Sequence, residues 1–177
     1  MTATKRTSPL DGDVGLRLER VVSGGQTGVD RAALDAALEL GIPCGGWCPR
    51  GRKAEDGRIP ECYPLKETPA ARYAERTEWN VRDSDGTLIV TAGPPAGGTA
   101  LTIACAERLG KPCLVVKLGP EAADGVSAIG WLREHRIRTL NIAGPRESQQ
   151  PGIYGRTREF LGSLFVMATS RRIAHEC

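Results

Sequence analysis

The chain has 177 residues, enough for one domain with a sizeable core, and its 40% hydrophobic and 25% charged residues are ordinary for a globular protein. Its formal net charge of +3 is too small to indicate a nucleic-acid partner. No apolar run approaches the ~20 residues that cross a bilayer, so we expect no membrane partner. Residues 1–15 are polar and lack the hydrophobic centre of a signal peptide. We expect them to be a disordered leader, and the protein to be cytoplasmic.

Strand and helix patterns alternate along the rest of the chain. Strands are expected near 18–23, 42–46, 87–91, 112–117 and 138–143, and helices near 29–40, 69–82, 99–109, 124–135 and 153–170. Gly41 is a natural stop for the first helix, and Thr68 is a natural cap for the second. Such βαβ alternation predicts an α/β fold, in which helices cover both faces of a mostly parallel sheet. We expect one domain over 16–170 and a tail at 171–177.

The run VVSGGQTGVD at 21–30 is the sharpest functional signal. A strand ends there in a glycine-rich turn, and a helix follows at once, which is the usual geometry of an anion site. The candidate phosphate-binding residues are Gly24, Gly25, Gln26, Thr27 and Gly28. The run has no lysine and is not a Walker A loop. A tight turn without a ligand is the alternative, and an aspartate at Gly25 would test it by repelling phosphate.

Two further loops follow predicted strands and should reach the same edge of the sheet. Gly97, Gly98 and Thr99 begin a helix and offer backbone N–H groups and a hydroxyl to a ligand, although Thr99 is equally a helix cap. Arg146 lies in the third loop and has the character to orient a heterocycle or a phosphate, with a surface arginine as the alternative. Because ligands bind at the carboxyl ends of parallel strands, the convergence of three such loops predicts one binding site.

Other polar residues are weaker candidates. Arg50, Arg52 and Lys53 lie in a basic loop that we interpret either as an anion-recruiting flap or as a solvated charged loop. Asn80 and Asp85 lie just before a buried strand, where they either contact the ligand or hold neighbouring loops.

No catalytic or metal-binding pattern emerges. There is no arguable Ser-His-Asp or Cys-His arrangement, so the sequence nominates no nucleophile. Cys44, Cys48 and Cys62 would need a fourth ligand to form a zinc site, and neither His135 nor His175 is near them in the sequence. We therefore expect neither catalytic residues nor a metal.

Four motifs in this order resemble the molybdenum carrier family, which belongs to a Rossmann-like superfamily. They are SGGQTGVD at 23–30, WNVRDSDGT at 79–87, GGT at 97–99 and NIAGPRES at 141–148. The resemblance covers roughly residues 18–165. It implies a single Rossmann-like domain, a homo-oligomer (a dimer or a tetramer), and molybdenum cofactor as bound cargo. The protein would hold and shield this phosphorylated pterin without transforming it.

Enzymatic members of the superfamily provide the alternative function. The phosphoribohydrolases carry a motif similar to P-G-G-x-G-T-x-x-E, whose glutamate is catalytic. When Thr99 is aligned with the threonine of that motif, Thr102 takes the place of the glutamate. The missing carboxylate argues against glycosidic cleavage. A nucleotide hydrolase or a non-catalytic nucleotide sensor remain the alternatives to a carrier.

Overall fold

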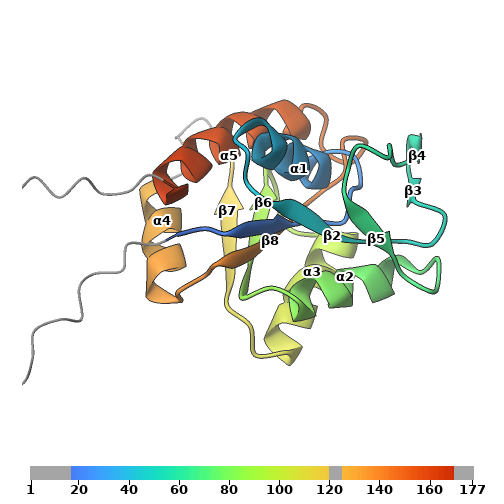
Figure 1. The fold of residues 1–177 in the computed structure, drawn as a ribbon, viewed down its shortest axis with the longest axis horizontal. Helices are drawn as coiled ribbons and strands as arrows, with labels where there is room; N and C mark the ends of the chain where they lie inside the picture. Colours follow the sequence, from blue (N-terminus) through green and yellow to red (C-terminus); the bar gives the residue numbers. More distant parts are fainter. Residues whose placement is uncertain (1–16, 120–124, 170–177) are drawn as a thin grey trace, which may run out of the picture.

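A six-stranded parallel sheet organises the computed structural model, which describes residues 17–119 and 125–169 (Figure 1). The strand order is β5-β2-β1-β8-β6-β7, and every pair of neighbours is parallel. The strands are β1 (Arg20–Val22), β2 (Cys44–Cys48), β5 (Leu65–Glu67), β6 (Gly86–Thr91), β7 (Cys113–Lys117) and β8 (Thr139–Ala143). The predicted α/β fold is confirmed.

Helices cover both faces of this sheet (Figure 1). One face carries α1 (Val29–Glu39), α4 (Gly125–Glu134) and α5 (Ile153–Thr169), and the other carries α2 (Tyr73–Arg82) and α3 (Gly97–Arg108). The largest core cluster joins the central strands to α1 and α5 and includes Leu88, Leu140 and Phe165, which are fully buried. Burial of these apolar side chains is the main force that holds the layers together.

The two ends of the described chain meet beside the sheet. The backbone N–H of Leu18 donates to the carbonyl of Ala168 over 3.4 Å, so the segment before β1 lies against the end of α5. Strands β1 and β8, the first and last in the sequence, are also neighbours in the centre of the sheet. The expected leader at 1–15 and tail at 171–177 lie outside the described residues.

The second predicted helix begins later than the sequence indicated. Helix α2 starts at Tyr73, and Thr68 does not cap it, so the predicted start near residue 69 is wrong. The hydroxyl of Thr68 donates to the carbonyls of Cys48 and Ala70, and its N–H donates to Cys48. Bonding to the end of β2 therefore keeps this segment extended.

Three short strands were not predicted from the sequence. Strands β3 (Lys53–Ala54) and β4 (Gly57–Arg58) form a small antiparallel hairpin, and β5 adds an edge to the main sheet. Each has only two or three residues, too few to show an alternating pattern. This hairpin matters for the site, because its turn reaches the loop that follows β1.

The two halves of the sheet lie on opposite sides of the β1–β8 pair. From β1 the chain proceeds outwards to β2 and β5, then crosses to β6 and β7 on the other side and returns to β8, which lies between β1 and β6. The loops that follow β1, β8 and β6 therefore surround a crevice at the carboxyl edge, which is where open parallel sheets bind ligands.

Candidate functional site

A small cleft of about 70 Å³ occupies this crevice. The cleft draws residues from all three predicted loops and from helices α1 to α3. They are Gln26, Asp30, Tyr73, Arg76, Thr77, Gly98, Thr99, Leu101, Thr102, Ala143, Gly144, Arg146 and Gln149.

The N-terminus of α3 is open to this cleft. Ala96 is the N-cap and makes no side-chain hydrogen bond to the helix, so Thr99 is not the cap. Gly97 and Gly98 form the first turn and are exposed, and a Cβ added to Gly98 would meet no atom within 4 Å. The N–H groups and the positive dipole end of this helix can therefore receive an anion from the cleft.

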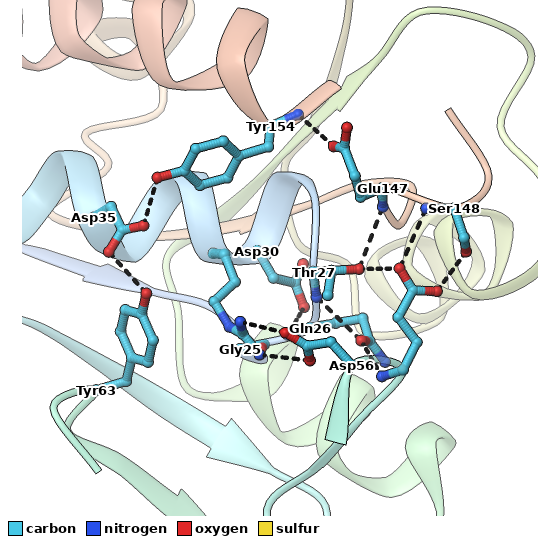
Figure 2. Close-up of polar contacts among 12 residues, drawn as sticks. Gly25, Gln26, Thr27, Asp30, Asp35, Asp56, Tyr63, Glu147, Ser148 and Tyr154 are labelled. Atoms are coloured by element: carbon cyan, nitrogen blue, oxygen red, sulfur yellow. Dashed lines mark hydrogen bonds and ion pairs between the residues drawn. The ribbon is translucent and has the colours of Figure 1, made fainter. Parts of the chain in front are cut away.

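A carboxylate of the protein itself is bonded at the turn that precedes α1, next to Thr27 and Ser148, which Figure 2 shows side by side. Glu55, from the turn of the hairpin, accepts hydrogen bonds from the hydroxyls of Thr27 and Ser148 and from the N–H of Ser148. Burial acts to raise the pKa of Glu55, but the bonds from Ser148 and Thr27 outweigh it and hold the pKa below its usual range. The first glycine loop thus faces a built-in anion.

The glycines of the first loop are needed for packing. A Cβ on Gly24 would lie 1.8 Å from a guanidinium nitrogen of Arg76, and one on Gly25 would lie 2.5 Å from a methyl carbon of Leu65. A Cβ on Gly28 would lie 2.5 Å from the carbonyl oxygen of Pro145. The absence of a Cβ at these three glycines lets neighbouring groups pack against the turn, and this packing fixes the position of the turn beside the cleft.

A buried ion pair forms part of the cleft wall. A guanidinium nitrogen of Arg76 lies 3.2 Å from Asp30 Oδ2, and the side chains are 13% and 4% exposed. Burial raises the pKa of the Asp30 carboxyl, and Arg76 opposes this effect. Sequence reasoning missed Arg76, because it lies in a polar helix 46 residues from its partner and no local pattern marks it.

Two nitrogen donors at this cleft have no partner. Gln26 Nε2 and Arg76 Nε are buried and make no hydrogen bond within the described part of the chain. Each buried donor that stays unpaired lowers the free energy of unfolding by on the order of 1–3 kcal/mol. Gln26 lines the cleft and is only 4% exposed, and its Nε2 atom is enclosed by the protein.

The third loop supplies a second cation. Arg146 lines the cleft, and its guanidinium lies 5.1 Å from the centroid of the Tyr73 ring. Its backbone N–H is held by the side-chain oxygen of Gln149 over 3.2 Å. Arg146 is therefore oriented towards the cleft by an aromatic ring and by its own loop.

The basic loop divides into exposed and buried residues. Arg50 and Lys53 are exposed, whereas Arg52 is only 4% exposed. Its guanidinium donates to the carbonyl oxygens of Ile59, Pro60, Tyr63 and Leu65. Arg52 therefore holds the hairpin against β5, and it is not one of the residues that line the cleft.

Asn80 and Asp85 hold neighbouring elements, which is one of the two roles the sequence left open. The Asn80 amide exchanges hydrogen bonds with the backbone of Trp47, 2.8 and 2.9 Å long, and so joins α2 to β2. Asp85 Oδ2 accepts the N–H groups of Arg138 and Thr139 at the start of β8, the opposite edge of the sheet from the cleft. We leave both residues out of the site.

A second, wider hollow is lined by Thr27 and by Asp35, Tyr63 and Tyr154, whose contacts Figure 2 shows. It measures about 470 Å³, and Asp35 of α1 accepts hydrogen bonds there from the hydroxyls of Tyr63 and Tyr154. Burial, and then the Asp35 carboxylate, raise the pKa of Tyr63 above its ordinary value. Thr27 faces this hollow rather than the cleft.

The described residues contain no cluster of three or more His, Cys, Asp or Glu side chains arranged to hold a metal. Cys48 is buried in β2, Cys44 is partly buried and Cys62 is exposed. Within the same residues, no helix is long and apolar enough to cross a membrane.

The position of the hydrolase glutamate carries no carboxylate here. Thr102, at the position of the hydrolase glutamate, is buried, and its hydroxyl donates to the carbonyl of Gly98 over 2.8 Å. Asp30 is the carboxylate that lines the cleft, and it is paired with Arg76. Hydrolysis of a glycosidic bond commonly needs a pair of carboxyl groups.

The comparisons with known proteins agree with the motifs. Residues 21–165 match the model of the circularly permutated YpsA SLOG family. The chain is also similar to a protein from Syntrophus aciditrophicus, solved at 1.45 Å and described as a "putative molybdenum carrier protein". The identity is 48%, the TM-score is 0.81, and the match covers 87% of this chain and 98% of that one. No curated protein matches. The family resemblance inferred from the motifs is thereby confirmed.

Proposed function

The chain belongs to the circularly permutated YpsA SLOG family, and from this premise we propose that it binds a small phosphorylated ligand, with molybdenum cofactor as the favoured cargo. The ligand is held and shielded in the cleft at the carboxyl edge of the sheet. It is not transformed there.

One observation carries the proposal: the open first turn of α3 faces cationic and neutral donors across a cleft of about 70 Å³. The N–H groups of Gly97 and Gly98 approach the phosphate from one side, and Arg146 balances its charge from another, whereas the charge of Arg76 is already paired with Asp30. The positive end of the helix dipole and the guanidinium of Arg146 both favour a phosphate group at this point.

We place the rest of the ligand at the mouth of the cleft, beside Tyr73. The exposed ring of Tyr73, over which Arg146 lies, offers a flat surface to a heterocycle. The name of the Syntrophus aciditrophicus protein supports molybdenum cofactor as the heterocycle. In a homo-oligomer, a second copy would complete the enclosure.

Cofactor retention tests the proposal. The purified protein is mixed anaerobically with free molybdenum cofactor and separated by gel filtration, and the protein peak is assayed for the fluorescent oxidised pterin. We expect stoichiometric retention that free cofactor competes away. Absence of retention would exclude this cargo.

Two matched variants localise the site. Gly98→Asp places a carboxylate in open space at the N-terminus of α3 and should abolish retention through charge repulsion. Gly130→Asp places the same charge in equally open space on α4 and should leave retention intact. Equal losses in the two variants would remove the α3 terminus from the site.

A nucleotide function is the second candidate, because the same cleft would accept the phosphate of a nucleoside monophosphate. AMP binding without cofactor retention would favour a nucleotide sensor. Release of the free base from AMP would establish a phosphoribohydrolase and contradict the argument from Thr102.

A further inference from the structure

The wider hollow, at the first turns of α1 and α5, is large enough for a small molecule. It measures about 470 Å³, and small-molecule sites commonly measure about 300–1,000 Å³. It shares no lining residue with the phosphate cleft, so the two are separate cavities. The charges and hydrogen bonds of its wall therefore decide what it can bind independently of the cleft.

The arginine that lines the hollow is already paired within the protein. Nη1 and Nη2 of Arg31 donate to the two carboxylate oxygens of Asp56 over 2.9 and 3.1 Å. Its Nε donates to the carbonyl oxygen of Gly25 over 3.1 Å, and the side chain is only 13% exposed. Because Asp56 compensates the charge of Arg31, this residue does not equip the hollow for an anion.

Two carboxylates line the same hollow and have neutral partners. Asp35 accepts the hydroxyls of Tyr63 and Tyr154 over 2.9 and 2.8 Å. Glu147 accepts the backbone N–H groups of Gly152 and, over 3.0 Å, of Tyr154. Within the described part of the chain, neither carboxylate takes part in an ion pair. Their oxygens can accept further bonds, so the hollow has acceptors and negative charge to offer.

Tyr154 brings this charge together with an aromatic surface. Its backbone N–H meets Glu147 and its hydroxyl meets Asp35, so the two carboxylates lie at opposite ends of one tyrosine (Figure 2). The ring of Tyr63 already has the guanidinium of Arg31 5.6 Å from its centroid. Guanidinium and ammonium groups gain from carboxylates and from aromatic rings alike, whereas an anion gains from neither.

We propose that this hollow is a second ligand site, which binds a small organic cation such as an alkylguanidinium. The proposal is carried by a hollow of about 470 Å³ whose arginine is paired and whose two carboxylates are not. Walls with unbalanced negative charge raise the local concentration of cations. Since the phosphate cleft contributes nothing to this wall, the inference goes beyond the proposed function and does not rest on it.

Ethylguanidinium is the probe, and ethylurea, which has a similar shape and no charge, is the matched neutral compound. Each is titrated at neutral pH and low ionic strength, where screening is weak, into protein with ¹³C-labelled tyrosine rings. The chain has three tyrosines, whose signals are assigned by replacing each in turn with phenylalanine. Ethylguanidinium should shift the signals of Tyr63 and Tyr154 saturably. The signal of Tyr73, which lines the phosphate cleft, should stay in place, and ethylurea should shift none of the three.

Asp35→Asn removes one negative charge and keeps an oxygen for a tyrosine hydroxyl. The dissociation constant for ethylguanidinium should rise roughly ten- to a hundredfold, the range for a hydrogen bond to a charged group. Glu159→Gln is the matched control, because it removes the same charge from an exposed residue of α5 that does not line the hollow. Its dissociation constant should stay within about twofold of wild type. Thermal unfolding shows whether both variants fold.

A network that only joins α1 to its neighbours would show no preference for charge. The inference is wrong if ethylguanidinium gives no saturable shift, if ethylurea gives equal shifts, or if Tyr73 moves with the other two tyrosines. Unchanged affinity in Asp35→Asn would also overturn it. If that variant does not fold, the comparison of the two compounds in wild type still decides. Phosphate binding and cofactor retention are measured separately, so the proposed function can stand or fall by itself.

Discussion

Replacing Arg52 by methionine should destabilise the fold without touching the ligand site. The Arg52 side chain is 5% exposed and donates to four carbonyl oxygens at 2.7 to 3.2 Å. Methionine keeps the length of the aliphatic stem but leaves those four acceptors without their donor. Arg52 also has a φ of 51°, a backbone angle that is unfavourable for arginine and methionine alike. The difference in stability between the two proteins therefore reports the loss of the guanidinium alone.

The magnitude follows from the bonds. A hydrogen bond to a charged group contributes about 1.5–3 kcal/mol, but four bonds from one group are not additive. Loss of one partner from a buried charged network costs about 3–5 kcal/mol, and we expect the free energy of unfolding to fall by that amount. In a chain of this size, that is a fall in Tm of roughly 6–20 °C.

Urea and thermal unfolding, followed by tryptophan fluorescence, measure the effect. Arg50→Met and Lys53→Met are the controls, because these exposed neighbours should stay within about 0.5 kcal/mol of wild type. A flap that recruits anions predicts the opposite pattern, in which all three variants lose ligand and none loses stability. An Arg52→Met variant as stable as Arg50→Met would refute the structural role.

Three further predictions test individual features. Gly28→Ala should lower the free energy of unfolding by about 2–4 kcal/mol in urea, because Gly28 has a φ of 75° and its Cβ would meet Pro145. Gly98→Ala should raise the free energy of unfolding by about 0.5–1 kcal/mol, because alanine favours a helix more than glycine does and its Cβ would lie in open space. The same change should weaken phosphate binding, as measured by calorimetry. The pKa of Asp56 is lowered by Arg31, so this pair stabilises the hairpin above about pH 4 and the stabilisation is lost as pH falls through the folded pKa. The ¹³C titration of the Asp56 carboxyl should have its midpoint below 3.8, and a midpoint at or above 3.8 would contradict the pairing.

The layers of the fold could be predicted from the sequence because they depend on repeated local signals. Helix α1 was expected over 29–40 and spans Val29–Glu39, since Gly41 adopts the left-handed conformation that ends a helix. The start of α2 could not be predicted, because Thr68 bonds to the end of β2, and that contact exists only after the sheet has formed. Tertiary contacts here outweigh the local preference.

The place of the site could be predicted, but its chemistry only in part. Loops that follow parallel strands must share an edge, so the meeting of Gln26, Thr99 and Arg146 in one cleft follows from topology. Arg76 and Tyr73 come from a mostly polar helix whose sequence marks no face for a ligand. Their contribution depends on where α2 crosses the sheet, which no local pattern encodes.

Two glycine-rich helix starts look alike in this sequence, and the structure separates them by what stands opposite each one. At α1 the glycines at 24, 25 and 28 admit Arg76, Leu65 and the Pro145 backbone, and the hairpin brings Glu55 onto the turn. Gly25→Asp therefore cannot report on phosphate repulsion, because its side chain would first meet Leu65 and Ile59. At α3 no side chain faces Gly98, so the favourable dipole of that helix is left to a ligand. The glycines allow close packing at α1 and leave the first turn open at α3. Which of the two occurs depends on the neighbouring residues that distant segments of the chain contribute.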